Sequence, residues 1–121
     1  MLIYCARIIA IGLTVRNCLA RNMLVTSASH TLESHVLSLE KFYNETNLLI
    51  LPGDRLFLAS KSYLITAVGR AAQKTLFDTG EVCMMFNGEL NAGHTCSLYL
   101  SGPAPDVQDL NGTLVIEEGW P

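Results

Sequence analysis

The sequence is short of charge. Charged residues make up 16% of the 121-residue chain, against about 25% in a typical soluble domain. Eight basic residues stand against 11 acidic ones, which gives a formal net charge of -3 without any Lys/Arg cluster. The chain therefore lacks the electrostatic footprint of a nucleic-acid-binding protein. Because half of the residues are apolar, so little charge indicates that partners cover part of the surface.

Catalytic signatures are missing as well. The four cysteines, Cys5, Cys18, Cys83 and Cys96, form no CxxC pair and lie at no zinc-finger spacing from a histidine. We expect small buried thiols, with a disulfide, most easily Cys83–Cys96 across a hairpin, or a metal site as the alternatives. The segment GRAAQKT lacks the glycine spacing of a phosphate-binding loop, and no GxSxG elbow occurs.

The residues left for chemistry are three histidines, His30, His35 and His94, and three carboxylates, Asp54, Asp78 and Glu81. The first two histidines are five residues apart, which is not the spacing of a helical HExxH zinc site. They are expected to be loop and surface residues, with a three-histidine metal site as the alternative. The carboxylates stand where turns ordinarily carry acidic residues. The prediction is therefore a protein that is not an enzyme, with no catalytic residue, metal or cofactor.

No apolar run is long enough to cross a membrane. The N-terminal stretch MLIYCARIIAIGLTV contains Arg7, and its uninterrupted part, residues 8–15, is far shorter than the roughly 20 residues that a spanning helix needs. It also lacks the features of a secretory signal, namely a preceding positive region and a small-residue cleavage site. We expect a strand with Ile9, Ile11, Leu13 and Val15 on one face, and a helix is the alternative.

What the sequence does contain is a series of short apolar runs with turn residues between them. Beyond Asn47 these runs are NLLIL, RLFLAS, SYLITAV, KTLF, EVCMMF, CSLYL and TLVIEE. Such a series predicts a mainly β protein, an antiparallel β-sandwich or jelly-roll-like barrel, over residues 1–121 as a single domain. One or two short helices at most are expected, between Ser29 and Asn44. A hairpin is expected near Asn17 to Asn22, and no long βαβ crossover indicates a parallel sheet.

The sharpest turn signal is Pro52-Gly53-Asp54. Proline fixes φ and cannot donate to a strand ladder, and glycine adopts positive φ without strain. Asp54 can accept a hydrogen bond from a nearby backbone amide and hold the bend. We expect this turn to end one strand and begin the next, with Leu56 and Leu58 on one face.

The stretch LLILPGDRLFLAS…YLITAVGR, from Leu48 to Arg70, resembles a pattern in small β-sandwich proteins of tailed-phage particles over residues 48–69. ARIIAIGLTVRN resembles the opening strand of such proteins more loosely. The resemblance implies a fibre, decoration or neck-associated module in a phage virion, with an oligomeric structural role and no catalytic residues. It implies as partners other copies of the chain and other particle proteins, with no nucleic acid and no membrane.

Two other functions stay open from the residues. The first is a carbohydrate- or ligand-binding module with Trp120 and Tyr99 as platforms, and the second is a small metal-dependent barrel enzyme using the histidines. For the structural role, the segment NGTLVIEEGWP is the candidate interface, with Thr113, Val115, Ile116 and Trp120 as its contact residues. Its strand can complete its own sheet or add to the open edge of a neighbour.

Overall fold

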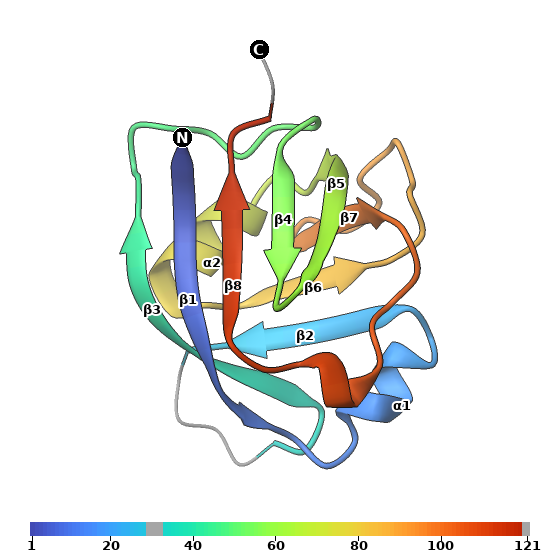
Figure 1. Ribbon diagram of the computed structural model, residues 1–121. Helices are drawn as coiled ribbons and strands as arrows, with labels where there is room; N and C mark the ends of the chain where they lie inside the picture. The colour runs from blue at the N-terminus through green and yellow to red at the C-terminus, as the bar shows by residue number, and fades with distance from the viewer. Residues whose placement is uncertain (29–32, 120–121) are drawn as a thin grey trace.

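The computed structural model describes residues 1–28 and 33–119 of the chain, and its strands close into a barrel (Figure 1). In chain order its elements are β1 (Leu2–Ile11), α1 (Val15–Leu19), β2 (Met23–Ser27), β3 (Val36–Asn44), β4 (Arg55–Leu58), β5 (Lys61–Val68), α2 (Ala72–Thr79), β6 (Val82–Met85), β7 (Ser97–Ser101), the 3-10 turn η1 (Val107–Asp109) and β8 (Thr113–Glu117). The predicted fold class, a mainly β barrel with at most two short helices, is confirmed. Within the described residues, no helix is long and apolar enough to cross a membrane.

The order of the strands around the barrel is β1-β3-β2-β6-β7-β5-β4-β8. Most neighbours are antiparallel, but β2 runs parallel to β3, and β6 runs parallel to β7. The predicted hairpin near Asn17 to Asn22 is therefore wrong, because α1 lies there and β3 separates β1 from β2. Closure gives every strand two neighbours, which limits the strand edge that is open to edge-to-edge association.

Both helices lie outside the range expected for them. The segment from Val36 is a strand, and the helices are α1 and α2, of which α2 includes the run KTLF that reads as a strand in the sequence. The apolar residues of α2 that face inward are Ala72, Leu76 and Phe77, at helical spacing. A four-residue apolar run does not distinguish the two structures by periodicity, which is the reason for the error.

The alternating runs fill the barrel as period-2 strands should. In β4, Leu56 and Leu58 are buried and Phe57 between them is half-buried. In β5, Tyr63 and Ile65 point inward in the same way. The interior is continuous with the helices, because Val15 of α1 and Leu76 of α2 belong to the same cluster of buried side chains.

The turn at residues 52–54 has the local chemistry that its residue types suggest. Gly53 has a φ of +100°. Asp54 accepts a hydrogen bond at its Oδ2 from the amide of Leu51 at 2.8 Å, and at its Oδ1 from the amide of Gly119 at 2.8 Å. The turn precedes β4, but residues 48–51 before it are not a strand, contrary to expectation.

The terminal strand β8 is paired on both sides, with β1 and with β4. It therefore completes its own barrel and has no free edge for a neighbouring copy. Ile116 is fully buried and is excluded as an interface residue, whereas Thr113 is exposed and Val115 half-buried. Trp120, the fourth residue of the candidate interface, lies outside the described residues.

Tyr4 is the largest fully buried side chain, and its ring stacks on Phe77 of α2 at a centroid distance of 5.9 Å. Burial raises the pKa of its hydroxyl to about 12. None of the described residues offers that hydroxyl a hydrogen bond. The side chain thus serves the core through its ring.

We predict that the pH dependence of stability at high pH depends on Tyr4. Between the ordinary tyrosine pKa of about 10 and the raised value, the unfolded chain loses the proton and the folded chain keeps it, so stability falls as the pH rises. Two pKa units correspond to about 2–3 kcal/mol. Tyr4→Phe should therefore change the free energy of unfolding little at pH 7 and should reduce its loss between pH 10 and 12. Urea titrations of the wild type and Tyr4→Phe at pH 7, 10 and 12 measure this. An equal loss of unfolding free energy with rising pH in the two proteins would contradict the prediction.

Candidate functional site

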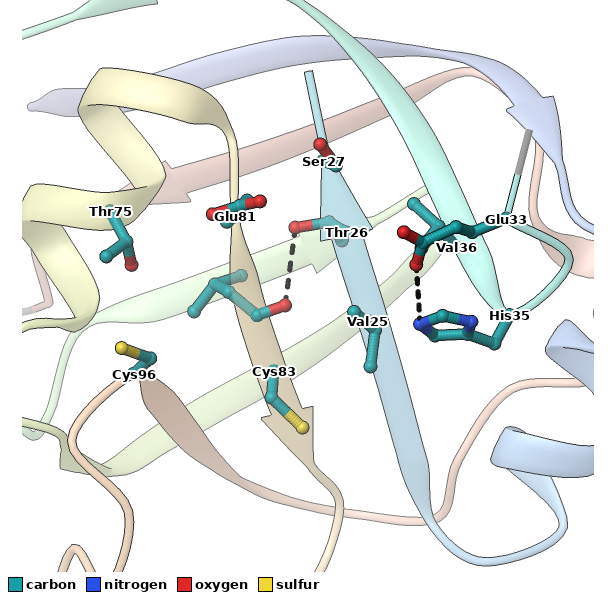
Figure 2. Close-up of a pocket in the computed structure, with 11 residues that line it drawn as sticks. Val25, Thr26, Ser27, Glu33, His35, Val36, Thr75, Glu81, Cys83 and Cys96 are labelled. Carbon is teal, nitrogen blue, oxygen red and sulfur yellow. Dashed lines mark hydrogen bonds and ion pairs between the residues drawn. The ribbon is translucent and has the colours of Figure 1, made fainter. Parts of the chain in front are cut away.

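A hollow of about 310 Å³ opens beside the end of β2, and it is lined by one histidine, two cysteines and two glutamates (Figure 2). It lies between the C-terminal end of β2, the residues before β3, the end of α2, and the beginnings of β6 and β7. The polar and reactive residues that line it are Thr26, Ser27, Glu33, His35, Thr75, Glu81, Cys83 and Cys96. We call it the His35 pocket.

One wall of the His35 pocket depends on the junction of β2 with α2. Gly80 ends α2 with a φ of +72°, and the next amide, of Glu81, donates to the carbonyl of Thr75 at 3.2 Å. The amide of Ala28 donates to the carbonyl of Thr79 at 2.8 Å, and the Thr26 hydroxyl donates to the carbonyl of Gly80 at 2.7 Å. These bonds position Glu81 at the rim of the pocket.

The opposite wall is formed by the segment that leads into β3. The Nε2 of His35 lies 3.3 Å from the Oε2 of Glu33, and both side chains are about half exposed, at 48% and 64%. Figure 2 shows the Glu33 carboxylate facing the edge of the imidazole ring. A carboxylate in this position favours the proton on Nε2, which leaves Nδ1 with a free lone pair in the neutral ring.

The backbone that carries His35 is held by the end of β1. The amides of Gly12 and Thr14 donate to the carbonyls of Val36 and Ser34, at 3.0 and 2.9 Å. Gly12 is required at this approach, because a Cβ there would collide with the carbonyl oxygen of Ser34. The two hydrogen bonds flank His35 and fix the place of its backbone.

The cysteines are free thiols, as the main expectation had it, but they are less buried than expected: Cys83 is half-buried and Cys96 exposed. All four cysteines are free, so the suggested Cys83–Cys96 disulfide is not formed. The two residues are neighbours through the backbone, since the amide of Cys83 donates to the carbonyl of Cys96 at 3.0 Å, but their sulfur atoms point apart in Figure 2. Burial raises the pKa of the Cys83 thiol above its ordinary value. Cys83 is therefore a thiol at neutral pH and a poor nucleophile.

The other sequence candidates do not gather at this site. His94 lines a different hollow, on the far side of Cys96, and His30 lies outside the described residues. Asp54 holds the turn before β4, and Asp78 pairs with Lys74 at 2.8 Å, so neither joins Glu81 at the pocket. Within the described residues, no three His, Cys, Asp or Glu side chains are placed to hold one metal ion. Tyr99 is 3% exposed and cannot be a carbohydrate platform.

The sequence reasoning missed this pocket because its residues come from segments far apart in the chain. The one local signal was Glu33 two residues before His35, and the two side chains meet because residues 34–35 form a turn, closed by the amide of Val36, which donates to the carbonyl of Glu33 at 3.4 Å. The sequence alone gives no sign that Glu81 and Cys83 lie beside them.

We predict that Gly80 holds the pocket wall for two reasons, its positive φ and its contact with β2. A Cβ at Gly80 would lie 2.5 Å from both the backbone nitrogen and the Cβ of Ala28. Gly112 is the matched control, because its φ is +85° but a Cβ there would meet nothing within 4 Å. Gly112→Ala should cost about 1–2 kcal/mol for the left-handed backbone. Gly80→Ala should cost about 1–3 kcal/mol more, for the collision. Equal losses in the free energy of unfolding would contradict the contact.

Comparison with known proteins identifies a different class from the one that the sequence suggested. A family model described as the PTS system glucitol/sorbitol-specific IIA component matches residues 3–115. The glucitol/sorbitol-specific EIIA components of Shigella flexneri and of Escherichia coli (strain K12) are each 29% identical to the chain over 109 residues, which is 86% of this chain and 85% of the relative. The crystal structure of a PTS system IIA component from Enterococcus faecalis V583 superposes with a TM-score of 0.72, covering 96% of this chain and 99% of that one at 19% identity.

These matches contradict the suggested phage role. The similarity to the EIIA components extends over most of the chain, whereas the phage resemblance rested on a Pro-Gly-Asp turn and two flanking runs. The interpretation as a virion subunit, the virion location and the partnership with particle proteins are therefore wrong. The carbohydrate-binding and metal-enzyme alternatives receive no support from these matches either.

Proposed function

The chain belongs to the family of PTS glucitol/sorbitol-specific IIA components, and on this premise we propose that it carries a phosphoryl group between protein partners during the uptake of a sugar alcohol. The observation that carries the proposal is the match of the family model over nearly the whole chain. Glucitol (sorbitol) is the substrate class that the names of its relatives indicate. The partners are then the IIB and IIC components of the transporter and the protein that supplies the phosphoryl group.

A phosphoryl carrier needs a nucleophile that a partner protein can reach. His35 meets this requirement: it is half exposed, it lines a pocket, and Glu33 orients its ring. Cys83 is the other candidate nucleophile in the same pocket, but burial raises the pKa of its thiol and keeps it protonated. His35 is therefore the phosphoryl acceptor in this proposal.

The transfer step can be written without a base. The Nδ1 lone pair of His35 attacks phosphorus, a nitrogen–phosphorus bond forms, and the bond from phosphorus to the donor side chain breaks with its electron pair leaving on the donor. No proton has to leave Nδ1, because Glu33 favours the proton on Nε2. Handing the phosphoryl group to the next protein is the same displacement in the opposite sense. A protein that carries a phosphoryl group takes part in a chemical reaction. The sequence-based prediction of a purely non-enzymatic role therefore holds only in part.

Complementation tests the function. In an Escherichia coli strain that lacks its own glucitol/sorbitol-specific EIIA component, expression of this chain should restore growth on sorbitol. Growth on glycerol, which needs no phosphoryl carrier of this kind in the test strain, controls for expression toxicity. If the folded, expressed protein neither restores growth nor takes label from the phosphorylated PTS proteins of that bacterium, the proposed function is wrong.

Labelling tests the acceptor. Radioactive phosphate passed from those PTS proteins should appear on the wild type and on Cys83→Ser, and His35→Gln should lose at least about 99% of the label, because glutamine has no nucleophilic ring nitrogen. His94→Gln is the matched control, since it removes a histidine from the neighbouring hollow. Label that persists on His35→Gln would assign the acceptor elsewhere while leaving the phosphoryl-carrier function intact.

A further inference from the structure

Three large apolar side chains lie exposed at the end of β1 and in the turn after it. Ile9 is 44% exposed, Ile11 39% and Leu13 90%. We call this group the Leu13 face. An aliphatic side chain as exposed as Leu13 contributes almost nothing to the stability of its own barrel, because it loses little surface to the interior. Its apolar surface is available to a partner.

The Leu13 face adjoins the His35 pocket. The two hydrogen bonds from Gly12 and Thr14 to the segment before β3 place Leu13 across from His35. The hydroxyls of Thr14 and Ser34, 3.0 Å apart, form a further link between the two segments. Ile11 and Leu13 line a shallow hollow of about 240 Å³, which shares Glu33 and Val36 with the pocket. Ile11 and Leu13 are therefore continuous with the pocket, and Ile9 precedes them at the exposed end of β1.

The negative charge of the pocket indicates which side chains a partner protein must supply. Two carboxylates, of Glu33 and Glu81, are among its lining residues, and none of those residues is Lys or Arg. A phosphoryl group on His35 would carry close to two negative charges near neutral pH. The positive charge that stabilises a phosphoryl group in transfer must then come from outside the pocket. Arginine supplied by a partner protein is a known solution in other phosphoryl-transfer proteins.

From these observations we propose that the Leu13 face is the docking surface for the protein that supplies the phosphoryl group to this chain. The partner surface that fits is apolar where it covers Ile9, Ile11 and Leu13, and it presents a basic side chain to Glu33 and Glu81. This arrangement, an apolar contact area around a few charged groups, is common in transient complexes. The inference rests on the proposed phosphoryl-carrier function.

The test compares two equally simple changes. Leu13→Ser and Leu90→Ser each remove an exposed leucine, at 90% and 79% exposure, but Leu90 lies in the connection between β6 and β7 and belongs to neither hollow. With the phosphorylated PTS proteins of Escherichia coli as donors below saturation, Leu13→Ser should slow labelling of the chain about tenfold or more, and Leu90→Ser should leave it unchanged. Ile9→Ser is the second variant and should act in the same direction. Raising the salt concentration should slow the wild type, because the charge contact is screened.

A small donor separates docking from chemistry. Phosphoramidate needs no docking surface, so it should label Leu13→Ser and the wild type at the same rate. Equal slowing with phosphoramidate would mean that the substitution disturbs His35 itself, which would overturn the docking assignment. Equal protein-donor rates for Leu13→Ser and Leu90→Ser would overturn it as well. If the wild type takes no label from the protein donors but does take it from phosphoramidate, the failure lies with the proposed function.

Discussion

The close approach of two backbones at Gly80 is the constraint on which most of this structure depends. Gly80 lies so near Ala28 that no side chain fits between them. The carbonyl of Thr79 accepts a hydrogen bond from the amide of Ala28, just after β2, and the carbonyl of Gly80 accepts one from the hydroxyl of Thr26 in β2. This junction ends α2 and fixes where β6 begins. With α2 seated there, Phe77 reaches the ring of Tyr4, and the Nζ of Lys41 donates to the Phe77 carbonyl at 2.8 Å. One glycine thus couples the barrel wall, its internal aromatic contact and the rim of the His35 pocket.

Closure of the barrel limits how the protein can recognise another. Each strand, including β8 at the end of the chain, has both neighbours within the same molecule. Main-chain hydrogen bonding of β8 to a partner strand, the mode suggested by the sequence of the last segment, is therefore closed off. Recognition has to use side chains on the outer surface. The exposed apolar residues where β1 ends are placed for this, because β1 there extends past β8 and is paired only with β3.

Much of the barrel wall could be predicted from the sequence, whereas the His35 pocket could not. Short apolar runs bounded by turn residues identified β4, β5 and β8, because runs of that length between turn signals are typical of strands. Parallel pairing of β2 with β3 and of β6 with β7 leaves no local mark in the sequence, so neither was predicted. The helix α2 was missed because KTLF is apolar and short. The phage resemblance failed because a Pro-Gly-Asp turn records only a local backbone requirement, and unrelated β proteins share it.

The acidic character of the His35 pocket fits a protein that passes a phosphoryl group on better than a protein that retains it. Like charges repel weakly in water and more strongly where the site is shielded. Glu33 and Glu81 both line the pocket, so a phosphoryl group on His35 would lie in a site of like charge, although Glu33 itself faces the ring edge opposite Nδ1. A partner that brings a basic side chain removes this repulsion only while it is docked. The phosphorylated chain is then less stable when free than when docked to a partner. The phosphoryl group is bound most favourably in the complex from which it can be transferred. Such a balance suits a protein whose task is to receive a group from one partner and surrender it to another.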